Sequence, residues 1–399
     1  VPACTQIIDA MPEGQPLWIS ALFFRGLARQ KLGDHMAAIA DFSAVLAADP
    51  GRLSALAGRA DSYLGAGRFD EAIADLDALI TAEPTVASRY INRGIAFSEK
   101  NRHERAIADF DKAIELDRDE PRAYENRATA LRKLGRFAQA ASDLDIAIGL
   151  DDGYAGSFFE RGICHTATRQ YDLAIADFDR AIALDPGDAM AYRERAVAHE
   201  LTGKLDLALA DFDRAIELDP NDATAFDNRG ALHGRRRHFD LAIADFDRAI
   251  ALDPDYAEAF SNRGNALLLQ RQYSKAIEDF DRAIALDPDL APALSNRGHA
   301  LVLAGEPARG LVDLDKAVAL DRKNAITLTD RSRALFALGR VQDALDGADE
   351  AVLIEPAYAP AYVSRGNAYR GQGKPARAIR DFEVAIALLP DDAEAHVMK

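Results

Sequence analysis

Cysteine is scarce in this sequence, which has only two, Cys4 and Cys164, among 399 residues. Two cysteines cannot form the disulfide framework that holds small secreted domains together. Long apolar runs are missing too, since none approaches the roughly 20 residues that a helix needs to cross a bilayer. We therefore expect neither a disulfide-stapled fold nor insertion into a membrane.

Positively charged residues are fewer than negatively charged ones. Lys and Arg number 48 against 65 Asp and Glu, which gives a formal net charge of −17. Non-specific binding to nucleic acid needs clustered cations that face the phosphates. Since the one dense basic run is Arg235–Arg237, the composition argues against nucleic acid as a partner.

The motifs of several enzyme classes do not occur. The sequence has no glycine-rich phosphate cradle and no serine in a nucleophile elbow. The acidic segments Asp253–Asp255 and Asp287–Asp289 lack the glycine and the distal glutamate of a calcium loop. We expect no catalytic residue, no metal site and no cofactor, and hence no enzyme.

What the sequence does have is a strict period of 34 residues. It is marked by a proline or an equivalent residue at Pro50, Pro84, Arg118, Asp152, Pro186, Pro220, Pro254, Pro288, Arg322, Pro356 and Pro390. Such a period indicates one supersecondary unit stacked many times rather than separate globular domains. It predicts an N-terminal capping helix and link at 1–18, eleven repeats over 19–392 and the start of a further helix at 393–399. The repeats are 19–52, 53–86, 87–120, 121–154, 155–188, 189–222, 223–256, 257–290, 291–324, 325–358 and 359–392.

The repeat at 223–256 illustrates the unit. Phe226 and Gly230 share one helical stripe in its first half, and Phe246 and Ile250 share another in its second half. Neither half alternates apolar and polar residues as a strand does, and the closing proline cannot continue a helix. The unit is therefore predicted to be a helix, a turn and a second helix.

The recurring positions resemble the tetratricopeptide repeat, whose pattern combines an aromatic and a small residue in the first helix with an alanine in the second. The aromatic-or-leucine position is held by Leu22, Leu56, Tyr90, Tyr124, Phe158, Tyr192, Phe226, Phe260, Leu294, Leu328 and Tyr362. The resemblance implies an all-α fold, a right-handed superhelical solenoid of about eleven helix-turn-helix repeats. It also implies that the first helices line a concave groove that binds segments of partner proteins. The NRG and AIADFDRAIALDP blocks are similar to those of bacterial members.

One departure from the family pattern concerns the residue before the small position. The family has leucine there, whereas this chain has arginine in every repeat, and an aspartate follows 16 residues later in nearly every repeat, as in Arg93 and Asp109. We predict an ion pair between the two helices of a repeat, because guanidinium and carboxylate groups suit a partly buried site. The alternative is a ladder of arginines for anionic ligands.

Asparagine immediately before this arginine is the sharpest polar signal for a binding face. An amide both donates and accepts hydrogen bonds, so a row of amides can bond to the backbone of an extended peptide. Related solenoids use asparagine ladders in this way, and the resemblance implies the same here. The alternative is that each amide bonds to a neighbouring helix. The row comprises Asn92, Asn126, Asn228, Asn262 and Asn296, and its polar lining is extended by Asn265, His299 and Asn367.

The remaining groove candidates differ in character from one repeat to the next. Phe23 and Phe24 are expected to make the first repeat apolar on this face, and Arg122, Arg132 and Lys133 are expected to make the fourth basic.

Three histidines, His165, His199 and His233, recur at one place of consecutive repeats. Packed helices lie about 8–10 Å apart, so three such imidazoles cannot share a zinc ion that needs each nitrogen at roughly 2 Å. We expect packing roles for them.

These observations favour a non-enzymatic scaffold or adaptor that binds a partner peptide or protein segment. Two alternatives stay open: the substrate-recruiting repeats of a larger enzyme, such as a glycosyltransferase or protease, and a structural protein that self-associates end to end. The opening Val1 and the short last segment indicate a processed or incomplete chain. They leave the compartment undecided between the bacterial cytoplasm and the periplasm or exterior.

Overall fold

The computed structural model describes residues 1–390, and this part of the chain consists of 23 helices without a strand. The predicted all-α fold is therefore confirmed. The chain divides into two compact units, Val1–Lys204 and Leu205–Lys399. The helix expected at 393–399 lies outside the described residues.

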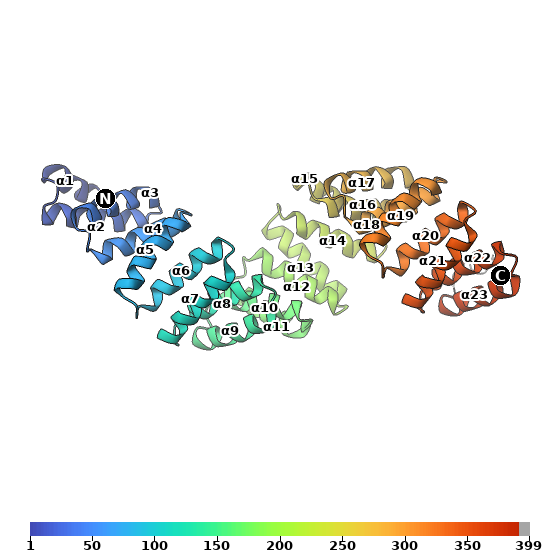
Figure 1. Ribbon diagram of the computed structural model, residues 1–399, viewed down its shortest axis with the longest axis horizontal. Helices are drawn as coiled ribbons and strands as arrows, with labels where there is room; N and C mark the ends of the chain where they lie inside the picture. Colours follow the sequence, from blue (N-terminus) through green and yellow to red (C-terminus); the bar gives the residue numbers. More distant parts are fainter. Residues whose placement is uncertain (391–399) are drawn as a thin grey trace. The chain divides into compact units, whose positions relative to one another are not determined.

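The first unit contains twelve of these helices, drawn from blue to green in Figure 1. They are α1 (Pro2–Ala10), α2 (Pro16–Lys31), α3 (His35–Ala48), α4 (Leu53–Gly65), α5 (Phe69–Ala82), α6 (Ala87–Glu99), α7 (His103–Leu116), α8 (Pro121–Lys133), α9 (Phe137–Leu150), α10 (Ala155–Ala167), α11 (Tyr171–Leu184) and α12 (Ala189–Leu201).

The second unit continues the alternation of helices. It contains α13 (Leu205–Leu218), α14 (Ala223–Arg235), α15 (Phe239–Leu252), α16 (Ala257–Leu269), α17 (Tyr273–Leu286), α18 (Ala291–Leu303), α19 (Pro307–Leu320), α20 (Ala325–Ala337), α21 (Val341–Ile354), α22 (Ala359–Gly371) and α23 (Pro375–Leu388).

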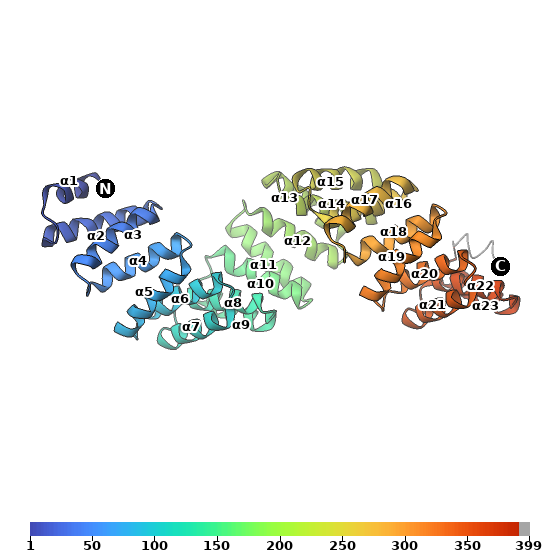
Figure 2. The same cartoon turned by 45° about the horizontal axis from the view of Figure 1, so that its top comes forward.

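Within each unit the helices stack as antiparallel pairs, each beside the next (Figures 1 and 2). An even-numbered helix contacts the odd-numbered helices before and after it. Even-numbered helices of neighbouring repeats also touch, as α6 touches α8 and α18 touches α20, and no comparable contact joins odd-numbered helices in the described part. The even-numbered helices therefore form the inner face of each unit.

The turn inside each repeat bends at one residue with positive φ, and these residues recur every 34 positions. Glycine, which adopts this conformation without steric cost, occupies seven of the turns, as at Gly135 with φ 74°. In the other four turns the residue is Asn101, Arg169, Arg237 or Arg271, with φ between 56° and 62°. The repeat period is thus visible in the backbone as well as in the side chains.

The small residue of the first helix leaves room for a large one of the second. A Cβ added to Gly94 would lie 2.6 Å from the fully buried ring of Phe110. In the repeat at 325–358 the first helix has a larger residue, and the second helix a smaller one, than elsewhere. Ser332 stands in place of glycine, and the buried Ala348 stands in place of the ring. Ser332 donates a hydrogen bond to the backbone oxygen of Ala344 at 2.7 Å. This repeat thus joins its two helices at this point by a hydrogen bond in place of the ring contact.

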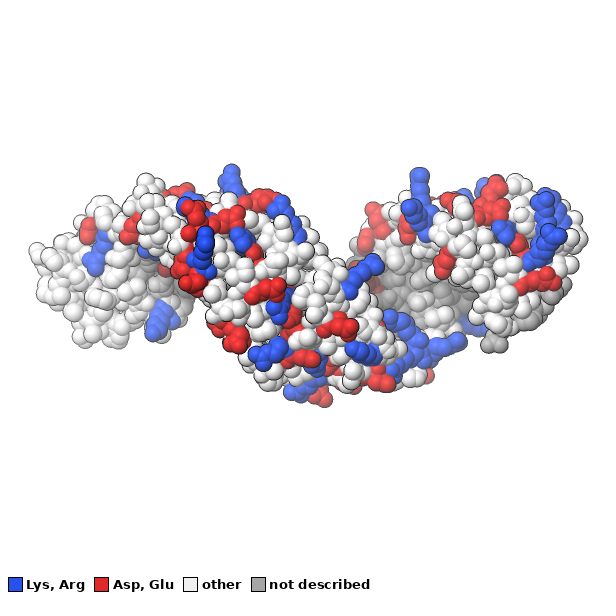
Figure 3. All heavy atoms as spheres, turned by 90° about the horizontal axis from the view of Figure 1, so that it is seen from below, with Lys and Arg blue, Asp and Glu red and all other residues white. Residues whose placement is uncertain are grey.

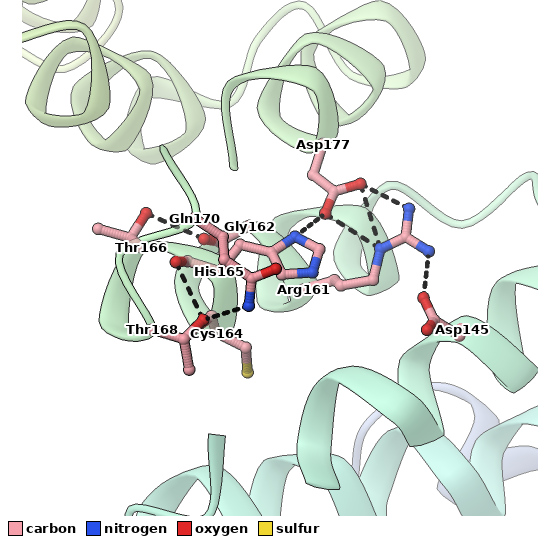
Figure 4. Close-up of polar contacts among 9 residues, drawn as sticks. All are labelled: Asp145, Arg161, Gly162, Cys164, His165, Thr166, Thr168, Gln170 and Asp177. Carbon is pink, nitrogen blue, oxygen red and sulfur yellow. Dashed lines mark hydrogen bonds and ion pairs between the residues drawn. The ribbon is translucent and has the colours of Figure 1, made fainter. Parts of the chain in front are cut away.

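The predicted ion pair between the helices of a repeat is present. In the fifth repeat Arg161 donates from Nη2 to Asp177 Oδ1 at 2.6 Å and from Nε to Asp177 Oδ2 at 3.0 Å (Figure 4). The same contact joins Arg25–Asp41, Arg59–Asp75, Arg93–Asp109, Arg127–Asp143, Arg229–Asp245, Arg263–Asp279, Arg297–Asp313 and Arg365–Asp381. The guanidinium groups are half-buried and occupied, which excludes the ladder for anionic ligands.

From Arg93 onward these arginines also reach back to an aspartate of the preceding repeat, a contact that the sequence reasoning did not predict. Arg161 Nη1 lies 2.7 Å from Asp145 Oδ1 on α9, two residues after the aspartate that pairs with Arg127 (Figure 4). Equivalent contacts recur from Arg93 with Asp77 to Arg365 with Asp349. The arginine therefore clasps three helices together, and we call this arrangement the arginine clasp.

Candidate functional site

A groove of about 730 Å³ opens on the inner face of the first unit. Its lining comes chiefly from the even-numbered helices α6, α8, α10 and α12, which the arginine clasp and the turns hold in fixed positions. Because these helices are stacked side by side, the groove is formed by several repeats and not by one hairpin.

Aromatic and apolar side chains stand open in this groove. Tyr154, the N-cap residue of α10, is 55% exposed, and Met190 on α12 is 51% exposed. The ring of Tyr154 lies over Gly156, where an added Cβ would approach it to 2.7 Å. Ile95 and Phe159 complete the apolar part of the lining.

The polar side chains of the groove are fixed by contacts between repeats. Ser157 donates from Oγ to Glu125 Oε1 at 2.6 Å, which joins α10 to α8. Arg132 Nε lies 2.5 Å from Glu160 Oε2, a second link between the same helices. Side chains that are already held in place lose little freedom when a ligand binds, which favours affinity.

The basic patch expected in the fourth repeat is only partly exposed to the groove. Arg122 lines it, and its charge lowers the pKa of the half-buried Asp61, which burial raises. Arg132 is paired with Glu160, and Lys133 is exposed but does not belong to the lining. Together these positions leave one guanidinium in the groove.

The second unit has a smaller groove, of about 300 Å³, on the inner face of α14 and α16. Two of the predicted binding residues, Asn262 and Asn265, line it together with Arg235. The remaining lining is apolar, and includes Phe239 and Leu269. This groove is therefore amide-lined, in contrast to the acidic lining of the first.

The five asparagines of the predicted row have different surroundings. Asn92 donates to Asp61 Oδ1 at 2.7 Å, a contact between neighbouring repeats. Asn126 donates to the backbone oxygen of Arg122 at 2.7 Å within its own helix, yet it still lines the first groove. Asn262 donates to both carboxylate oxygens of Asp227, at 3.0 and 3.1 Å. The side chains of Asn228 and Asn296 form no hydrogen bond with other residues of the described range 1–390.

Asp227, which accepts the bonds from Asn262, is only 5% exposed. Burial raises the pKa of this carboxyl to about 6, the hydrogen bond from Asn262 lowers it, and the nearby Glu258 raises it. Burial and the charge of Asp227 together raise the pKa of Tyr256 to about 12. The pKa of Asp227 in the second unit is thus raised towards neutral pH.

The other predicted lining residues are placed as follows. His299 Nδ1 lies 2.8 Å from Asp330 Oδ1, a contact between neighbouring repeats. The Asn367 Oδ1 atom is buried and has no hydrogen-bond partner in the described part of the chain. Phe24 is 59% exposed, whereas Phe23 packs edge-on against Phe42 at 5.9 Å between ring centroids.

The face seen in Figure 3 carries few charged side chains at the N-terminal end of the first unit, at the left of the view. Further along this unit, acidic and basic side chains are interspersed. The exposed Phe24 and Leu27 of α2 belong to the weakly charged end of the chain.

The recurring histidines and the cysteine in the fifth repeat serve the helix contacts. His165 Nδ1 lies 3.0 Å from Asp177 Oδ2 and shares that carboxylate with the arginine clasp (Figure 4). Burial raises the pKa of the Cys164 thiol to about 11, so the thiol stays protonated at neutral pH. Over residues 1–390 no group of three or more His, Cys, Asp or Glu side chains is arranged to hold a metal ion.

Models of known families match several stretches of the chain. One described as tetratricopeptide repeat matches residues 25–87 and 161–223, and a second of the same description matches 87–120 and 257–290. A model described as TPR repeat matches 238–271, and a further tetratricopeptide-repeat model matches 359–392. The chain is built of tetratricopeptide repeats. Such repeats are typical of scaffolds for interactions between proteins.

Solved structures are similar to this chain, and two of them share its fold with TM-scores above 0.5. The Cut9–Hcn1 hetero-tetramer of the APC/C aligns with a TM-score of 0.51 at 13% identity, over 95% of each chain. A tetratricopeptide repeat protein from Parabacteroides merdae aligns with a TM-score of 0.51 at 19% identity, over 62% of this chain and 98% of its own. YrrB, described as a TPR protein with an unusual peptide-binding site, is 28% identical over 46% of this chain and 95% of its own, with a TM-score of 0.39.

No curated protein sequence gives a significant match to the chain. In the described residues no helix is long and apolar enough to span a membrane.

Sequence reasoning missed the groove residues that lie at the junctions between repeats. Tyr154 and Asp188 are the last residues of their repeats and cap the first helix of the next one, a place at which the tetratricopeptide pattern has no fixed residue. Gly156 was a usable signal, because it is the one glycine at the second position of a first helix in this chain. An unusual small residue on an inner face indicates that a neighbouring side chain lies across it.

Proposed function

We propose that the chain is a non-enzymatic scaffold that binds an extended segment of a partner protein along the inner face of its repeats. The proposal takes residues 19–392 as eleven repeats and 1–18 as an N-terminal cap. The observation that carries it is the groove of about 730 Å³ over α8 and α10, in which aromatic and polar side chains are both open and held in place.

The chemistry of the groove suits a peptide better than a small reactive substrate. Ligand sites combine apolar walls with a few placed polar groups, and Tyr154, Met190 and Asn126 supply both kinds here. An extended segment exposes backbone donors and acceptors along its length, and amide side chains such as Asn126, Asn228 and Asn296 can bond to them whatever its sequence. The repeat blocks, which resemble those of bacterial proteins, lead us to propose a bacterial scaffold.

The test is selection from a peptide-display library on the complete chain, followed by affinity measurements on the selected peptides. Thr129 lines the groove, so Thr129→Trp should fill it and reduce the affinity at least about tenfold. Leu173→Trp adds the same ring to the outer face, where Leu173 is already 51% exposed, and should leave the affinity unchanged. Circular dichroism melts establish that both variants are folded. Peptides that bind Thr129→Trp as tightly as the unmodified chain would contradict the proposal.

A further inference from the structure

Two carboxylates in the groove of the first unit are fixed in position and still have a free oxygen. Asp151 caps the end of α9 and accepts from the backbone of Gly153 through Oδ1 at 3.0 Å. Asp188 caps the start of α12 and accepts from the backbone of Met190 through Oδ1 at 2.9 Å. Among the described residues, Oδ2 of neither carboxylate receives a hydrogen bond. Both aspartates line the groove.

An exposed aromatic ring belongs to the same lining. Tyr154 follows Asp151 by three residues and lies across Gly156, which leaves the ring open to the groove. An aromatic face attracts a cation placed within about 6 Å of its centre, and neighbouring carboxylates strengthen that attraction. A ring that shares its groove with two carboxylates is therefore suited to a positively charged side chain.

The net charge of the whole groove lining also favours a positively charged ligand. Four carboxylates, those of Glu125, Asp151, Glu160 and Asp188, face one guanidinium, that of Arg122. Arg132 neutralises Glu160 from outside the lining, and the acidic excess remains. Complementary charge raises the rate and the specificity of association, so a basic segment is favoured over an acidic one.

We propose that this groove binds an extended partner segment through a lysine or arginine side chain, with an apolar residue next to it. The cation lies against Tyr154 between Asp151 and Asp188, and the apolar neighbour lies against Ile95 or Met190. The inference rests on the proposed function and specifies the chemistry of its partner. The groove of the second unit has no carboxylate in its lining, so it should not share this preference.

The experiment applies the selected peptides to a charge variant and to its matched control. Asp151→Asn with Asp188→Asn removes both carboxylates but keeps side chains that can cap a helix. The control, Asp34→Asn with Asp117→Asn, removes the same charge at two capping aspartates outside the groove. Each pair is introduced into the complete chain, and affinities are measured by fluorescence anisotropy at low and high salt.

We expect the selected peptides to be enriched in Lys or Arg beside an apolar residue. They should bind the groove variant about threefold to tenfold more weakly, the loss expected for two partly exposed ion contacts. The difference between the groove variant and the unmodified chain should shrink at high salt because salt screens exposed charges. The control pair should bind as the unmodified chain does.

Three results would overturn the inference, and they are distinguishable from failure of the proposed function. In the first, the selected peptides lack basic residues and bind the groove variant as tightly as the unmodified chain, but they do not bind Thr129→Trp. The groove would then still be a peptide-binding site, and the preference for a basic partner would be refuted. An equal loss in the control pair would show a general charge effect and refute it too. Peptides that are indifferent to Thr129→Trp would refute both proposals.

Discussion

At the scale of single residues, side chains at equivalent positions have unlike surroundings. Asn92 and Asn262 stand at the same place in their repeats, yet the first bonds to Asp61 and the second to Asp227. These two aspartates occupy different positions in the first helix of the preceding repeat. The sequence predicted that these amides lie on one face. It could not predict their partners, because these depend on how two neighbouring repeats are rotated against each other.

Asp227 allows a pH-dependent prediction. Its pKa is raised to about 6, mainly by burial, whereas an aspartate in an unfolded chain titrates near about 3.9. A raised pKa means that the protonated carboxyl is favoured in the folded state, so its contribution to stability is fully present below about pH 4 and is lost as the pH rises through about 6.

Replacing Asp227 with asparagine should therefore raise the free energy of unfolding at pH 7.5, by on the order of 1–3 kcal/mol. It should also flatten the dependence of stability on pH between about 4 and 6, where the folded state binds the proton and the unfolded state does not. Urea unfolding at both ends of this range measures the change, and the exposed Asp255→Asn serves as a control in the same unit. A variant that keeps the original pH dependence would show that Asp227 does not titrate in this range.

At the scale of helices, the apolar stripes and the 34-residue spacing predicted the two helices of each repeat and the ion pair between them. What escaped prediction was the second arm of the arginine clasp. The motif Asp-Phe-Asp, as at Asp109 and Asp111, places one carboxylate on either side of the buried ring. The first pairs with Arg93 of its own repeat and the second with Arg127 of the next. The second aspartate of the motif was visible in the sequence. Its partner could not be identified from one repeat, because the two residues meet only where neighbouring repeats are in contact.

The clasp predicts unequal costs for two arginine substitutions in the second unit. Arg263→Ala leaves Asp279, which is 7% exposed, without its partner, and an unpaired buried charge costs about 3–5 kcal/mol. Arg331 pairs with the half-exposed Asp315 alone, because Gly347 stands where the buried aspartate would be. Arg331→Ala should therefore cost about 0–1 kcal/mol. Urea unfolding monitored by circular dichroism compares the two, and equal losses would mean that the buried arm of the clasp adds no stability.

At the scale of the whole molecule, the fold class could be predicted from the sequence because the same 34-residue pattern recurs along the chain. Each repeat contacts chiefly its neighbours, so one recurring pattern specifies every hairpin. The groove was harder to predict, because Ile95, Asn126, Tyr154 and Asp188 come from three different repeats and meet only when these stack. The sequence thus pointed to the inner face, but not to where on that face the open groove lies.

The most direct test of this account is hydrogen exchange of the complete chain with and without a peptide selected from the display library. Binding on the inner face predicts slower exchange of backbone amides in α8 and α10, with α9 and α11 of the same repeats unchanged. Protection confined to the odd-numbered helices, or the same protection in Thr129→Trp, would contradict it.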